Sequence, residues 1–169
     1  MWRISQLLVF GILAGMLSCS SIAASPIERR PVSHFEVTTL DGHAIDSASL
    51  KGRVTLVHFW ATWCAPCQEE MPALDKFYRE HQRDGFVVIA ISVDDTADEQ
   101  KVREMARRFA FPVAMREAAK VDGFGRLWVV PLSFLIDRQQ IVRKRDWTGP
   151  EKIDADSLER LVLPLLKEN

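Results

Sequence analysis

The stretch Trp60-Ala61-Thr62-Trp63-Cys64-Ala65-Pro66-Cys67 places two cysteines two residues apart, directly after a run of apolar residues. That run, residues 54–60, predicts a buried strand. The second cysteine, Met71 and Leu74 then recur at the spacing of an amphipathic helix. Pro66 suits the first turn of a helix, because its missing N–H would have no partner there. The cysteine pair is therefore predicted where a buried strand gives way to the N-terminus of a helix.

The two thiols are predicted to have different roles. The free N–H groups and the dipole at a helix N-terminus stabilise an anion, so Cys64 should be the exposed thiolate nucleophile. Cys67, one helical turn later, should lie beneath it as the more buried, resolving thiol. A thiolate that attacks a substrate disulfide forms a mixed disulfide, which a second nearby thiol resolves. The spacing also allows a reversible Cys64–Cys67 disulfide, so the pair is the candidate redox centre.

Other uses of a cysteine pair fit the sequence less well. A zinc site needs four ligands, and Cys19 is the only further cysteine in the sequence. A haem-attachment motif would require histidine after the second cysteine, where Gln68 stands. A purely structural disulfide stays open as an alternative. We expect no metal and no cofactor.

Several segments together resemble the thioredoxin superfamily, in particular the exported TlpA-like or ResA-like thiol–disulfide oxidoreductases. The WCAPC motif after an apolar strand carries the resemblance, and Pro72 stands where that family's active-site helix has a kinking proline. Val130-Pro131, followed by residues 132–137, resembles the segment in which a cis-proline faces the cysteines and opens a strand. Residues 35–42 resemble the N-terminal hairpin of the TlpA-like branch. The likeness runs from about residue 35 to the C-terminus.

This resemblance implies an α/β fold of the thioredoxin type, with a central mixed β-sheet flanked by helices and an N-terminal β-hairpin extension. It implies reduction of protein disulfides, with electrons supplied by a membrane partner of the DsbD or CcdA type. Roles in apocytochrome c maturation or in metal-site assembly would follow. Leu132 departs from the cytochrome branch, which commonly has an acidic residue after the cis-proline, so the client stays open.

The resemblance also implies roles around the cysteine pair. The backbone of Val130, beside Pro131, could pair with an extended substrate, strand to strand. Trp63 offers a flat apolar contact to partners, and Ala65-Pro66 adjoin it. His58 stands where thioredoxins carry a buried acid that moves protons to and from the inner cysteine. It is therefore a candidate proton relay, with a core histidine bonded to a backbone carbonyl as the alternative.

The N-terminal region predicts export. Residues 1–24 carry a positive Arg3 and an apolar stretch shorter than a spanning helix requires, which indicates a signal peptide. Cleavage after small residues at 21–23 is one outcome. Lipidation of Cys19, in a lipobox-like context, is the other, and it would attach the protein to a membrane. We expect a bacterial periplasmic location, a linker over residues 25–33 and one domain over residues 34–169.

Composition excludes other classes. The formal net charge of −1 and the 47% hydrophobic content of the 169 residues do not suggest disorder or nucleic-acid binding. The length is sufficient for one domain with a buried hydrophobic core.

The remaining elements follow from periodicity and turn signals. We predict helix over 65–81, a parallel strand over 86–92 and a helix beginning near residues 94–96. A short strand near Val113, a brief helix over 118–123, an antiparallel hairpin over 132–147 and a final helix complete the prediction. That helix would be capped by Asp156 with Glu159, and Pro164 would kink it or end it early. Glu69 and Glu70 are alternative proton carriers, and we expect them to stabilise the first helical turns or to face solvent. Trp128 and Trp147 are expected in core or edge packing.

Two alternative functions have the same fold. A copper chaperone of the Sco kind uses cysteines spaced by three residues and a distant downstream histidine, whereas no histidine follows His81 here. A peroxiredoxin would have threonine or serine three residues before its reactive cysteine, where Ala61 stands. Both features count against these alternatives.

Overall fold

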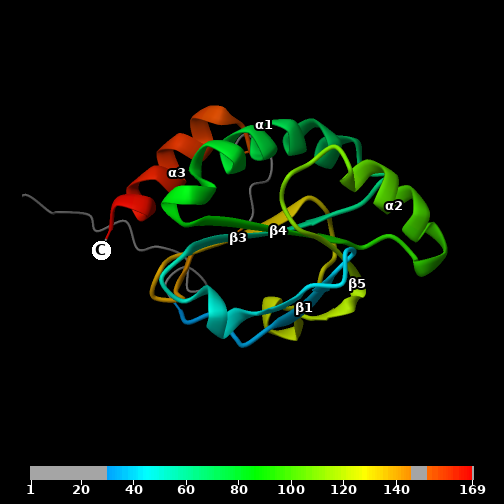
Figure 1. Cartoon of the computed structure of the whole chain (residues 1–169), viewed down its shortest axis with the longest axis horizontal. Helices are drawn as coiled ribbons and strands as arrows, with labels where there is room; N and C mark the ends of the chain where they lie inside the picture. The colour runs from blue at the N-terminus through cyan, green and yellow to red at the C-terminus, as the bar shows by residue number, and fades with distance from the viewer. Residues whose placement is uncertain (1–29, 146–151, 169) are drawn as a thin grey trace, which may run out of the picture.

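A mixed sheet and three α-helices make up residues 30–145 and 152–168, which the computed structural model describes (Figure 1). The strands are β1 (Glu36–Thr39), β2 (Ala44–Asp46), β3 (Val54–Trp60), β4 (Phe86–Ser92), β5 (Val113–Lys120), β6 (Leu132–Ile136) and β7 (Val142–Arg145). The helices are α1 (Ala65–His81), α2 (Glu99–Ala106) and α3 (Ala155–Lys167). Short 3-10 helices are η1 (Ser47–Leu50), η2 (Gln82–Asp84), η3 (Thr96–Asp98) and η4 (Asp122–Phe124). The strand order is β2-β1-β5-β4-β3-β6-β7, which confirms the predicted central mixed sheet.

Strand β3 is the centre of this sheet. All seven of its residues are buried, and it pairs parallel with β4 and antiparallel with β6. Its side chains alternate between the two faces: Leu56 and Trp60 join one core cluster, and Val57 and Phe59 join the other. Both faces are covered, which explains why the strand is apolar without alternation. The strand ends where the cysteine motif begins.

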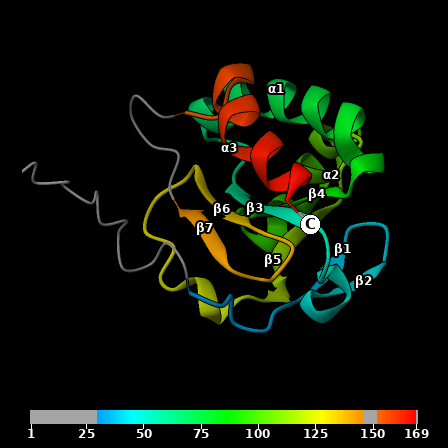
Figure 2. The ribbon, with the colours of Figure 1, turned by 90° about the vertical axis from the view of Figure 1, so that its left-hand side faces the viewer.

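The two faces of the sheet are covered differently. All three α-helices pack on one face, as Figures 1 and 2 show from perpendicular directions. The core there joins Met71 of α1, Val102 of α2 and Leu158 of α3 to β3 and β4. The opposite face is covered by the short helices η1 and η4, through Leu50 and Phe124. The N-terminus of α1 is thereby held beside the end of β3.

The N-terminal hairpin is part of the sheet. Strand β1 pairs antiparallel with β2 and, on its other side, with β5. Gly42 has a φ of +87°, which a glycine adopts without strain, in the turn between the two strands. The predicted hairpin extension is confirmed.

One prediction between β4 and β6 is wrong. Strand β5 extends to Lys120, so residues 118–120 are strand where a helix was expected, and only Asp122–Phe124 form a 3-10 turn. The reason is tertiary pairing, because Ala119 and Lys120 lie opposite Val37 and Glu36 of β1. The local residue preferences of this segment carry no information about its pairing with β1.

The final helix also begins differently from the prediction. Its N-cap is Asp154, and Ser157 closes the capping box with it, so Asp156 and Glu159 do not form the cap. Pro164 neither ends α3 nor shortens it, since the helix continues to Lys167. The apolar face of α3, with Leu158, Val162 and Leu165 buried, holds it against the sheet despite the lost hydrogen bond.

Several expectations lie outside the described residues. They are the targeting segment 1–24 with Cys19, most of the linker 25–33, and Trp147. Within the described part of the chain, every helix is too short or too polar to cross a membrane.

Candidate active site

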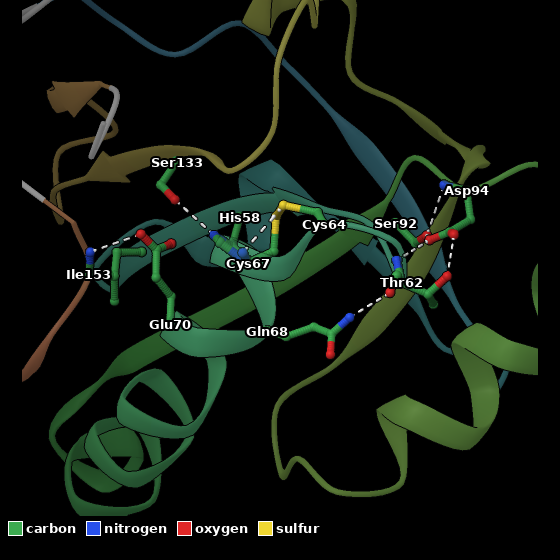
Figure 3. Close-up of a disulfide and its surroundings, with 10 residues drawn as sticks. All are labelled: His58, Thr62, Cys64, Cys67, Gln68, Glu70, Ser92, Asp94, Ser133 and Ile153. Carbon is green, nitrogen blue, oxygen red and sulfur yellow. Dashed lines mark hydrogen bonds between the residues drawn. A yellow bond between two sulfur atoms is a disulfide. The ribbon is translucent and has the colours of Figure 1, made fainter. Parts of the chain in front are cut away.

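The two cysteines form a disulfide at the start of α1, with their Cα atoms 5.3 Å apart (Figure 3). Cys64 is the N-cap residue of the helix, and its Sγ accepts a hydrogen bond from the backbone N–H of Cys67 at 3.3 Å. A thiolate at Cys64 would receive this same N–H and the positive end of the helix dipole. The structure therefore places the sulfur of Cys64 where an anion is stabilised.

The accessibility of the two sulfurs differs less than expected. Cys64 is 5% exposed and Cys67 is 0% exposed, so the predicted order holds but Cys64 is not an exposed residue in the disulfide form. Trp63, by contrast, is 69% exposed, and Ala65 and Pro66 are also at the surface. Access to the disulfide is thus narrow and flanked by apolar surface.

A buried carboxylate holds the loop that carries the motif (Figure 3). Asp94, which follows β4, accepts hydrogen bonds from the backbone N–H of Thr62 at 2.8 Å and from its Oγ1 at 2.5 Å. Ser92 Oγ donates to the same carboxylate at 2.6 Å, and Gln68 Nε2 donates to the carbonyl oxygen of Thr62 at 2.6 Å. Every polar group of Thr62 is therefore bonded, which fixes the approach to Cys64. Residues 94–96 predict only the start of a helix, and no local pattern in the sequence indicates this clamp.

The Val130–Pro131 peptide bond is cis, as the resemblance implied. Val129, Val130 and Pro131 line a groove of about 410 Å³ together with Pro66 and Glu70 of α1. We call this the Pro131 groove. It brings the cis-proline segment to the same concavity as the cysteine motif, although 64 residues of sequence lie between Pro66 and Pro131.

Glu70 lines this groove and is nevertheless buried, contrary to the expectation that it faces solvent. It is 4% exposed, and its Oε1 accepts a hydrogen bond from the backbone N–H of Ile153 at 3.2 Å. Oε2 has no hydrogen-bond partner among the described residues. Burial raises the pKa of Glu70 to about 7. The helical spacing from Cys67 to Glu70 and Met71 was the signal that places it on the inner side of α1.

His58 is fully buried, as predicted from its strand face. Its Nδ1 lies 2.8 Å from Ser133 Oγ, its register partner on β6, so the partner is a hydroxyl group and not a backbone carbonyl. Nε2 has no partner among the described residues. Burial lowers the pKa of His58 to about 4, so the ring is neutral near pH 7. It shares a strand face with Leu56 and Trp60, which pack in the same cluster as both cysteines.

Trp128 contradicts its prediction. It is 79% exposed, and neighbouring Val129 is 60% exposed, so this segment is neither core nor edge packing. Grouped metal-ligating atoms in the described residues occur at the surface of the β1–β2 hairpin, on His34, Glu36 and Asp46, and the cysteine pair takes no part in them.

Comparison with known proteins agrees with this geometry. The model of the AhpC/TSA family matches residues 29–145. The thiol–disulfide oxidoreductase ResA of Bacillus cereus is 36% identical over 114 residues, covering 66% of this chain and 65% of that relative. The sporulation thiol–disulfide oxidoreductase A of Bacillus subtilis is 27% identical over 143 residues, covering 82% of this chain and 86% of the relative.

Solved structures show the same architecture. A protein of Chlorobium tepidum described as the thiol:disulfide interchange protein DsbE has a TM-score of 0.69 and 25% identity, over 82% of this chain and 97% of that chain. The chain belongs to the AhpC/TSA family and has the thioredoxin-like fold.

Proposed function

We propose that the protein is a thiol–disulfide oxidoreductase that reduces disulfides of protein clients through Cys64 and Cys67. The observation that carries this proposal is the disulfide at the N-terminus of α1, beside the groove that Pro66 forms with cis-Pro131. The names of the relatives, thiol–disulfide oxidoreductases, support the same chemistry.

The reaction has two exchange steps. In the dithiol form, the Cys64 thiolate attacks one sulfur of the client disulfide, forms a mixed disulfide and releases one client thiolate. Cys67 then loses its proton and attacks Cys64 Sγ, which releases the second client thiolate and forms the Cys64–Cys67 disulfide. The client gains two electrons and the protein loses two. A separate electron donor must restore the dithiol.

The second step needs a base for the proton of Cys67, and Glu70 suits this role better than His58. A base works best with a pKa near the working pH, and that of Glu70 is raised to about 7 by burial. His58, with a pKa lowered to about 4, resists taking a proton in the neutral range. Glu70 also lies one helical turn after Cys67, on the same buried side of α1.

Variants separate the two candidate bases. If Glu70 is the base, Glu70→Gln slows resolution of the mixed disulfide and flattens its pH dependence near 7, while His58→Asn leaves that pH dependence in place. A general base contributes about 10²–10⁴-fold, and water reaching Cys67 would reduce this. The reverse pattern would return the role to His58.

Export and a reducing direction form the second part of the proposal. The signal-like residues 1–24 support a periplasmic protein, with Cys19 as a lipid anchor or as part of a discarded peptide. In such a compartment a reductase needs a membrane donor of the DsbD or CcdA type, and apocytochromes or metal-assembly proteins are the clients that the resemblance favours. Trp63, Ala65, Pro66 and the backbone of Val130 would contact the client.

The redox potential of the Cys64–Cys67 pair tests the direction. A value near about −270 mV, as in thioredoxin, supports a reductase, and a value near about −120 mV, as in DsbA, would make the protein an oxidant. Trapping tests the chemistry itself: Cys67→Ala should accumulate a mixed disulfide at Cys64 with a client protein. If Cys64 forms no mixed disulfide under oxidising conditions, the proposed activity is wrong.

A further inference from the structure

A second groove shares one wall with the Pro131 groove, namely the loop of residues 125–131. Val93, Arg116, Asp122, Arg126, Leu127 and Trp128 line it, and its volume is about 650 Å³. We call it the Arg126 groove. The run of residues 125–131 joins the two: its first half lines the Arg126 groove and its second half lines the Pro131 groove.

The Arg126 groove adjoins the end of the central sheet that carries the cysteine motif. Val93 follows β4, and its backbone N–H donates to the carbonyl oxygen of Trp60, the last residue of β3, at 2.8 Å. The next residue, Asp94, holds the motif loop through Thr62. A partner chain seated in this groove would therefore lie close to the start of the cysteine motif.

Core packing does not account for two side chains of this groove, Trp128 and Arg126. Trp128 is 79% exposed, and the guanidinium group of Arg126 stacks over its ring at 4.9 Å from the centroid. Exposed large apolar side chains mark interaction sites, and Trp with Arg is the composition typical of binding hot spots. The pair offers a flat apolar surface with a positive charge on top of it.

The charge of the groove is positive. Asp122 is the single carboxylate among its lining residues, and it lies 3.6 Å from Arg116 Nη2. Arg126 has no ion-pair partner in the described part of the chain. One guanidinium group thus stays uncompensated beside an exposed tryptophan, which favours an acidic partner over a basic one.

We propose that the Arg126 groove binds an extended segment of the client, in which an aspartate or glutamate accompanies an apolar residue near the reactive cysteine. This inference rests on the proposed function and specifies its substrate class. An extended chain advances about 3.3 Å per residue, so a client that follows residues 130 to 126 places its acidic residue three or four positions from its cysteine. The acidic residue would face Arg126 and the apolar one Trp128.

Peptides test this preference directly. Peptides with a single cysteine, activated as a 2-thiopyridyl disulfide, would react with reduced Cys67→Ala protein, and the released pyridine-2-thione reports the rate. Each series consists of a glutamate peptide and a lysine peptide that are otherwise identical. The series differ in whether this residue lies three or four positions from the cysteine, and in whether it precedes or follows the cysteine. We expect the glutamate peptide of one series to react about three- to tenfold faster than its lysine counterpart, with the ratio falling at high salt.

Variants assign this ratio to the groove. Arg126→Glu should reverse the preference, and Trp128→Ala should slow both peptides of the preferred series. Arg108→Glu makes the same change of charge at an exposed arginine that does not line the groove, so it should keep the parent ratio. The ratio is taken within each protein, so any change in the reactivity of Cys64 cancels.

The proposal is overturned if the Arg126→Glu and Arg108→Glu proteins give equal ratios, or if no series of the parent distinguishes glutamate from lysine. 2-Hydroxyethyl disulfide is uncharged and too small to occupy the groove. Its reaction with the parent protein therefore tests the proposed oxidoreductase activity separately from the docking proposal. Without that reaction the proposed function itself fails, and the docking proposal fails with it.

Discussion

At the scale of single residues, the protonation of Glu70 couples the stability of the protein to pH. Burial raises its pKa from 4.5 to about 7, so between these values the folded protein holds a proton that the unfolded chain has released. Stability from this residue therefore falls as the pH rises through that window. As the pH rises through this window, the unfolding free energy of Glu70→Gln should increase by up to about 3 kcal/mol relative to that of the parent.

Urea unfolding of the oxidised protein at a series of pH values measures this gain. Glu69→Gln, a change of the exposed neighbour, is the matched control and should follow the parent curve. Parallel curves for Glu70→Gln and the parent would contradict a raised pKa at Glu70.

His58 should have the opposite effect on stability. Burial lowers its pKa from 6.5 to about 4, so in this window the unfolded chain binds a proton that the folded protein does not. Its contribution is present above pH 6.5 and is lost as the pH falls towards 4. The unfolding free energy of each protein is compared with its own value at pH 7. On acidification, that of the parent should fall by up to about 3 kcal/mol more than that of His58→Asn.

The two windows overlap with opposite signs, so the parent should show little net change from this pair near pH 5 to 6.5. The double variant provides the check, since its pH dependence there should resemble that of the parent. A His58→Asn curve that runs parallel to the parent would show that the imidazole titrates normally.

At the scale of elements, the Asp94 clamp joins the end of β4 to the loop between β3 and α1. Asp94→Asn replaces one acceptor oxygen by an amide that faces the donors of Thr62 and Ser92. We expect a loss of about 2 kcal/mol in unfolding free energy, together with faster hydrogen exchange at the Thr62 amide. Asp95→Asn, at the exposed next residue, should change neither quantity. Unchanged exchange at Thr62 in Asp94→Asn would contradict the clamp.

At the scale of the whole molecule, the N-terminal hairpin completes the core on the face that lacks α-helices. Phe35 is 1% exposed, and its ring lies 5.3 Å from that of Phe124 in η4. Phe35→Ala should therefore cost about 3–5 kcal/mol in unfolding free energy, as for any large buried aromatic residue. Thr38→Ala, at an exposed position of the same hairpin, is the control and should cost much less. A small effect of Phe35→Ala would mean that the hairpin is an appendage of the fold.

Residues that are adjacent in the chain are enough to predict the strand, the helix and the cysteine pair of the active site. The apolar run of β3, the proline in the first turn of α1 and the cysteine spacing each depend on residues adjacent in the chain, and the structure confirms the resulting strand and helix bounds. The cis bond before Pro131 followed from the resemblance. Local pattern was sufficient because these features are set within one strand or one turn of helix.

The chemistry around these elements depends on contacts between segments that are distant in the sequence. Ser133 beside His58, Ile153 beside Glu70 and Asp94 beside Thr62 are contacts between segments 75, 83 and 32 residues apart. The same holds for the exposure of Trp128. A single sequence contains no signal for which distant segment covers a side chain. Burial depends on that cover, and burial shifts the pKa values of Glu70 and His58 in opposite directions.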